Sequence, residues 1–138
     1  MDYSMLLLVL LGCPLAAALL IAVLPAKSTP RGAYETLHVL SLAGVAVAGL
    51  TLVVAAFAGS DIFALGEWFH LDGLSALFLG LIAVIAPCTG VYSLPYVAHD
   101  VAEGKLGPSQ VKQYYAFFSL FVFSMILAVT SNNIIMMW

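Results

Sequence analysis

Charged residues are scarce in this sequence. They make up 8% of its 138 residues, with four Lys or Arg, seven Asp or Glu and a net charge of −3. A soluble domain carries about 25% charged residues, and so few charges could not cover the surface of a soluble sphere of this size. Four basic residues also offer little to the phosphates of a nucleic acid. A soluble globular domain and a nucleic-acid partner are therefore both excluded.

Cysteine and ligand-binding motifs are equally sparse. Cys13 and Cys88 are far apart and form no CxxC pair, which excludes a redox pair or a cluster site. No glycine fingerprint is present, and no His, Cys and carboxylate residues have the spacing of a zinc site. We therefore expect no cofactor, no metal site and no catalytic centre in this chain.

Apolar residues, by contrast, are abundant, at 64% of the chain with a mean hydropathy of +1.12. A helix needs about 20 apolar residues to cross a bilayer core of about 30 Å. Four stretches reach or approach this length: Met5–Leu24, His38–Ala58, Leu74–Leu94 and Tyr114–Thr130. After them, the chain turns apolar once more at Ile134. These runs predict an all-α integral membrane fold, a bundle of four transmembrane helices plus the start of a fifth. We interpret residues 1–138 as the N-terminal part of one membrane domain.

The few basic residues lie in two of the connections. Lys27 and Arg31 lie between the first and second spans, and Lys105 and Lys112 between the third and fourth. The N-terminal flank and the connection Gly59–Gly73 contain none. Because positively charged loops stay in the cytoplasm, we expect a multi-pass protein of a bacterial-type inner membrane with its N-terminus outside.

The connections differ in their expected structure. Ile62–Leu71 combines aromatic and β-forming residues around Gly66, which predicts a short outer hairpin. Val97–Gln113 contains two glycines and a proline and is interpreted as an inner loop with little structure of its own. Within the spans, Gly44 and Ala48 are four residues apart, which would allow a neighbouring helix to approach closely.

Two candidate residues lie just before the third span. Asp72 is expected to cap that helix, because a carboxylate accepts hydrogen bonds from the free N–H groups of its first turn. The alternative is an acidic group at the mouth of an ion path. His70 is two residues away, on the same side if the segment is extended.

The other candidates lie at span ends. His38 could relay protons, because an imidazole titrates near neutral pH, although a lone histidine at this position more commonly reaches the membrane interface. Asn132 and Asn133 separate the fourth span from the next apolar run, where two amides could cap both helices. They could instead line a hydrated path.

Several short motifs resemble the antiporter-like subunits of respiratory complex I, group 4 hydrogenases and multi-subunit sodium/proton antiporters. They are Asp-Gly-Leu-Ser at 72–75, Tyr-Ser at 92–93, the double Tyr at 114–115, Ser-Met at 124–125 and Asn-Asn at 132–133. The Asn-Asn pair followed by Met-Trp is most similar to the hydrogenase-4 component F type. The resemblance covers most of the chain, and is best from Leu65 onward.

The resemblance implies a part in coupling electron transfer to the translocation of protons or sodium ions. Such subunits are built from inverted helix repeats and use a glutamate in the fifth helix, which would fall four residues beyond Trp138. Asp72 matches an aspartate at the head of the family's third helix. The partners would be other membrane subunits and the lipid bilayer, with flavin, iron–sulfur or nickel–iron centres on other chains of the complex.

Two other classes of protein remain open from the sequence. One is a small accessory or structural subunit of such a complex, which fits the absence of Asp, Glu, Lys and Arg from the four spans. The other is a small secondary transporter, although such a protein usually carries a charged residue within the membrane. The coupled ion, and the choice among NADH dehydrogenase, hydrogenase and antiporter complexes, are not determined.

Overall fold

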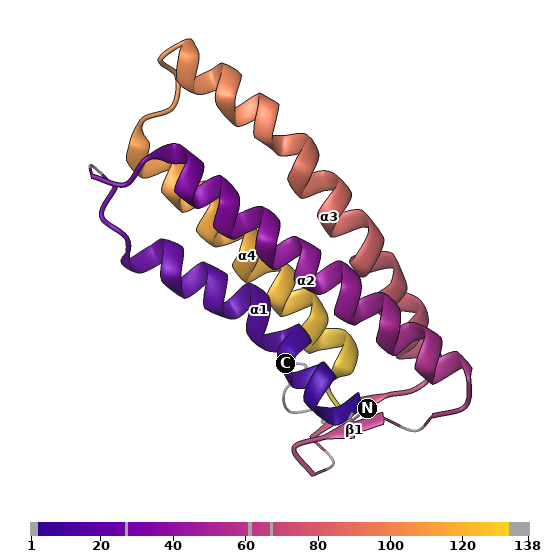
Figure 1. Ribbon diagram of the computed structural model, residues 1–138. Coiled ribbons are helices and arrows are strands. Elements are labelled where there is room, and N and C mark those ends of the chain that lie inside the picture. Colours follow the sequence, from indigo (N-terminus) through magenta and orange to yellow (C-terminus); the bar gives the residue numbers. More distant parts are fainter. Residues whose placement is uncertain (1–2, 27, 61, 67, 133–138) are drawn as a thin grey trace.

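The fold is a bundle of four long helices closed at one end by a β-hairpin (Figure 1). The computed structural model describes residues 3–26, 28–60, 62–66 and 68–132. The elements are α1 (Tyr3–Val23), α2 (Arg31–Phe57), β1 (Ile62–Ala64), β2 (Phe69–Leu71), α3 (Gly73–Ala102) and α4 (Pro108–Thr130). All four helices are long and apolar enough to cross a membrane. The predicted all-α membrane fold is confirmed, while the expected fifth helix from Ile134 lies outside the described residues.

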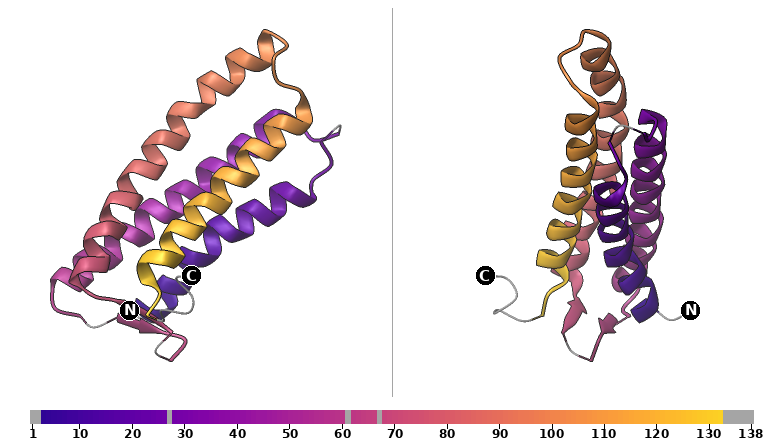
Figure 2. Two further views of the ribbon diagram at one scale, coloured as in Figure 1. Left: turned by 180° about the vertical axis from the view of Figure 1, so that it is seen from behind. Right: turned by 90° about the vertical axis from the view of Figure 1, so that its left-hand side faces the viewer.

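The helices are arranged so that α1 packs against α2 and α4, and α3 packs against the same two helices. The beginning of α1, the hairpin and the end of α4 lie together at one end of the bundle, which we call the hairpin end (Figure 2). The connections α1–α2 and α3–α4 lie at the opposite end, which we call the loop end. The described basic residues, Arg31, Lys105 and Lys112, belong to the loop end.

Two helices are longer than their apolar runs. α2 begins at Arg31, seven residues before the predicted start at His38. Its first turn carries the i,i+4 ion pair between Arg31 and Glu35, a spacing that supports a helix in water. α3 has 30 residues, or about 45 Å at 1.5 Å per residue, which exceeds the bilayer core. Hydropathy marks the length that can lie in lipid, whereas backbone hydrogen bonding continues beyond it.

The loop expected over Val97–Gln113 is a wrong prediction. α3 continues to Ala102 and α4 begins at Pro108, so only five residues separate the two helices. Pro108 is suited to a first helical turn, where no N–H partner is needed. The Gln110 side chain accepts a hydrogen bond from the Gly107 N–H at 2.8 Å, and Gly104 ends α3 with a φ of +72°. The glycines and the proline therefore mark helix ends.

Small residues set the closest approaches between helices. A Cβ atom on Gly44 would lie 3.1 Å from Cys13 Sγ, so that α1 and α2 meet at the predicted small-residue face. A Cβ on Gly49 would lie 2.8 Å from the Cβ of Ala83, where α2 meets α3. Close packing of this kind is what holds helices together in lipid, where apolar contact with lipid competes with apolar contact between helices.

Large apolar side chains cover the outside of the bundle. Val47 and Val54 of α2 and Phe117 of α4 are among those more than 60% exposed. On the lipid-facing side, Thr51 Oγ1 donates to the Val47 carbonyl at 2.7 Å, and Ser124 Oγ to the Phe121 carbonyl at 2.8 Å. Polar groups exposed on a membrane helix need partners of this kind.

Candidate functional site

The hairpin end contains three of the candidate residues. β1 and β2 pair antiparallel with Phe63 opposite His70, as the sequence predicted for this connection. The rings of Phe63 and His70 stack at 4.3 Å with an interplanar angle of 4°. Beyond α4, Ser131 forms a β-bridge with Phe69, and the Asn132 N–H donates to the Trp68 carbonyl at 2.9 Å. The chain after α4 is thus joined to the hairpin.

Asp72 is the N-cap of α3. Its Oδ1 accepts a hydrogen bond from the Ser75 N–H at 2.7 Å. This hydrogen bond, with a smaller contribution from the nearby His70, lowers the pKa of the Asp72 carboxyl. His70, Asp72 and Asn132 share this end of the bundle, while Asn133 lies outside the described residues. Their part in an ion path stays a prediction.

Replacing Asp72 by alanine is expected to destabilise the bundle by about 1 kcal/mol, the usual contribution of an N-cap. Because the folded pKa is lowered, the stabilisation by Asp72 is full at neutral pH. It is lost as the pH falls below about 4 and through the folded pKa. Unfolding of the protein in mixed micelles, followed by circular dichroism at several pH values, would measure both effects. Asp72→Ala should lose this acid dependence, and an unchanged pH profile would contradict the cap.

His38 lies on the other half of the bundle, with its side chain between α2, α3 and α4. It is fully buried, with its ring centroid 4.9 Å from that of Tyr115 and 4.9 Å from that of Phe118. On the third side, a Cβ on Gly90 would lie only 3.0 Å from His38 Nε2. His38 thus lies two turns after the start of α2 with its ring inside the bundle. Its position relative to the membrane interface and its part in a proton relay stay predictions.

Three buried serine hydroxyls lie at about the same level of the bundle as His38. Ser41 of α2, Ser93 of α3 and Ser119 of α4 are buried together with His38, and we call these four residues the polar layer. Along each helix they lie between two separate apolar clusters, one toward the hairpin end and one toward the loop end. The polar layer therefore interrupts the hydrophobic core.

The polar layer is only partly hydrogen-bonded. Ser93 Oγ donates to the Gly90 carbonyl at 2.7 Å. The His38 ring approaches the Gly90 backbone, but neither ring nitrogen forms a well-directed hydrogen bond with any described residue, and the same holds for Ser41 Oγ and the Tyr115 hydroxyl. Buried polar groups in proteins almost always have a partner, which is often water. Such a group is the usual mark of a site that takes water or a ligand.

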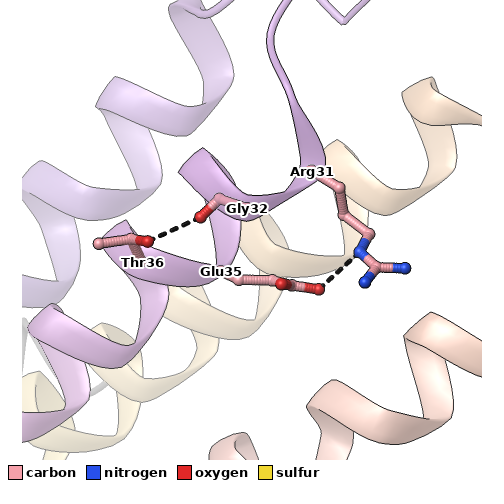
Figure 3. A network of polar contacts seen from close by, with 4 residues as sticks. All are labelled: Arg31, Gly32, Glu35 and Thr36. Carbon is pink, nitrogen blue, oxygen red and sulfur yellow. Dashed lines mark hydrogen bonds and ion pairs between the residues drawn. The ribbon is translucent and has the colours of Figure 1, made fainter.

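A charged pair lies between this layer and the loop end. Arg31 Nε and Glu35 Oε1 are 2.8 Å apart, with side chains 41% and 23% exposed (Figure 3). Both charges act on the hydroxyl of Tyr115, which faces them from α4. Glu35 was not predicted from the sequence, and Tyr115 was noted there only as part of the double Tyr at 114–115. The available signal was the spacing of Tyr34, His38 and Ser41, which repeats at helical intervals on one face of α2.

No metal cluster is found at either place. Among residues 3–26, 28–60, 62–66 and 68–132, no group of three or more His, Cys, Asp or Glu side chains could hold a metal ion. Cys13 and Cys88 are both free. The titratable groups that the structure describes at these two places are the carboxyls of Asp72 and Glu35, the imidazoles of His70 and His38, and the Tyr115 hydroxyl.

Four apolar helices with a lipid-facing exterior define a multi-pass helical membrane protein. The chain is similar to a hydrogenase-4 component F homolog of Methylacidiphilum infernorum, with 36% identity over 73 residues, which are 53% of this chain and 15% of the relative. It is 34% identical to NADH-quinone oxidoreductase subunit L of Campylobacter jejuni over 65 residues, 47% of this chain and 10% of the relative.

A chain of an NADH-ubiquinone oxidoreductase is among the relatives as well. NADH-ubiquinone oxidoreductase chain 5 of Neurospora crassa is 28% identical over 78 residues, covering 52% of this chain and 10% of that protein. The chain thus spans between 10% and 15% of the length of these relatives. No family model matches it, and no solved structure does. The predicted resemblance to antiporter-like membrane subunits is confirmed by these relatives.

Proposed function

We propose that this chain contributes four helices to an ion-translocating membrane subunit in a complex of the NADH:quinone oxidoreductase or hydrogenase-4 type. The observation that carries the proposal is the 36% identity to a hydrogenase-4 component F homolog, supported by the similarity to NADH-quinone oxidoreductase subunit L. In this role the chain contributes helices that hold an ion path, while redox centres of the flavin, iron–sulfur or nickel–iron kind belong to other chains.

The orientation in the membrane is part of the proposal. The loop end, with Arg31, Lys105 and Lys112, faces the cytoplasm, because basic residues are retained on that side. The hairpin end and the N-terminus then face the outside of a bacterial-type inner membrane. His70, Asp72 and Asn132 lie at the outer mouth of the path, and His38 lies on its cytoplasmic half.

Purification from native membranes tests this function. An affinity tag placed on the chromosomal gene, followed by extraction in a mild detergent, is expected to recover the chain with membrane and redox subunits of an NADH dehydrogenase or hydrogenase. Recovery together with a second, full-length antiporter-like subunit would favour an accessory role. Recovery without any redox subunit, with cation transport by the reconstituted chain alone, would overturn the proposal in favour of a small secondary transporter.

A further inference from the structure

The polar layer has one feature that packing does not explain, namely a fully buried imidazole whose two nitrogens form no well-directed hydrogen bond with any residue that the structure describes. Leaving a buried polar group without a hydrogen bond costs about 1–3 kcal/mol in proteins. An apolar side chain of similar size at position 38 would avoid this cost, since Leu42 and Val45 fill the next turns of the same helix face. The cost is offset if His38 binds a proton or water there.

The groups that face His38 form a path toward only one end of the bundle. Toward the loop end are Tyr115 and then Glu35, whose side chain is 23% exposed and paired with Arg31. Toward the hairpin end, the next buried side chains on the same helices are apolar. α3 contributes the Gly90 backbone and Ser93. α1 contributes no Asp, Glu, His, Lys or Arg between Tyr3 and Val23.

The glycine at position 90 allows the backbone of α3 to lie next to the His38 ring. A Cβ there would lie 2.1 Å from Leu42 Cδ1 and 3.0 Å from His38 Nε2. Because Gly90 has no side chain, its backbone lies directly next to the imidazole. The Gly90 carbonyl already accepts one hydrogen bond, from the Ser93 hydroxyl. The Gly90 backbone and the Tyr115 side chain thus flank one buried imidazole, and polar groups in this arrangement suit a proton carried by water.

We propose that His38 is a proton-binding site, filled from the loop end through Glu35, with the Tyr115 hydroxyl holding the water that joins them. One proton passes from the protonated Glu35 carboxyl to that water, while the water gives one of its own protons to an unprotonated nitrogen of His38. The transfer breaks an O–H bond, forms an N–H bond and involves no electron transfer. Glu35 is then re-protonated from solvent. In the proposed ion-translocating subunit, this site is the entry for protons from the cytoplasm, and its physiological role rests on that proposed function.

Proton exchange at His38 can be measured on the whole chain in lipid nanodiscs. With 15N-labelled histidine, the ring signals of His38 are identified as those that disappear in His38→Gln. We expect the His38 signals to change with pH between about 4 and 9, a range that spans the ordinary imidazole pKa. We also expect the His38 N–H to exchange with water. Signals of His38 that stay constant over this range, with a ring N–H that does not exchange, would overturn the proposal.

The route is tested by variants at the entry. Glu35→Gln and Tyr115→Phe are expected to slow exchange at His38 by about 100-fold, the lower end of what a positioned acid–base group contributes. The matched control is Glu103→Gln, which removes another carboxylate of the loop end and should leave His38 unchanged. The signals of the half-buried His70, which stacks on Phe63 in the hairpin, report that each variant is folded. Equal exchange in Glu35→Gln and the parent chain would contradict the route.

The outcome is independent of the assembly of the complex. If His38 exchanges no protons while the tagged chain still purifies with redox subunits, the proton site is wrong and the proposed function stands. If His38 exchanges as expected but no redox subunit is recovered, the site stands without that function.

Discussion

Replacing Gly49 by alanine is expected to destabilise the bundle by about 1–3 kcal/mol, the usual cost of overpacking. The added Cβ would lie 2.8 Å from the Cβ of Ala83 on the facing helix. Neither methyl group has a rotamer that could relieve the clash, so α2 and α3 must move apart. Unfolding with SDS in mixed micelles, followed by circular dichroism, would measure the loss.

The chain offers a matched control and a rescue for this change. Gly80 also lies between α2 and α3, but a Cβ there would be 3.8 Å from the Val53 methyl groups, an ordinary contact. Gly80→Ala should therefore leave stability unchanged or raise it by up to about 1 kcal/mol, since alanine favours helix. Combining Gly49→Ala with Ala83→Gly should recover most of the lost stability. A Gly49→Ala protein as stable as the parent would show that the helices do not meet at this position.

Removing the four basic residues is expected to disturb the orientation of the whole chain. Lys27, Arg31, Lys105 and Lys112 are all the Lys and Arg residues present. Each contributes about 1 kcal/mol of attraction to an anionic cytoplasmic leaflet, and basic residues near span ends determine orientation. With all four changed to glutamine, we expect the protein to insert in both orientations.

A cysteine in the connection between α2 and β1, which the proposed orientation places outside, can report this orientation. In a chain with Cys13 and Cys88 replaced by alanine, Ser60→Cys should react with a membrane-impermeant maleimide in intact cells. In the glutamine variant, part of the protein should react only after permeabilisation. Asp100→Asn with Glu103→Gln is the control, expected to have no effect because acidic residues contribute little to orientation. Labelling of the parent only after permeabilisation would mean that the N-terminus is inside.

The sequence was sufficient to predict the membrane class, the four spans and the hairpin. Each depends on a local property, either a long uncharged run or β-forming residues around Gly66. The helix ends were less predictable, because Arg31 and Glu35 are charged and yet belong to α2. A helix that extends past the lipid can carry charges in its outer turns, so the end of an apolar run is a poor guide to the end of the helix.

The candidate site was predicted only in part. Asp72 could be placed at a helix start because capping is local. The burial of His38 could not, because it depends on Gly90 of α3 and Tyr115 of α4, which are more than 50 residues away in the sequence. Glu35 was overlooked for the same reason: its importance comes from the phenol that α4 places beside it.

The packing of α1 against α4 has a consequence for synthesis in the membrane. α1 packs against α4, although α2, the hairpin and α3 are made between these two helices (Figure 1). A nascent chain that has inserted α1, α2 and α3 but not α4 therefore leaves the α4-facing side of α1 without its protein neighbour. Since Tyr115 also arrives with α4, His38 becomes fully enclosed by protein only when α4 enters the membrane. Assembly of the core is thus a late event during translation.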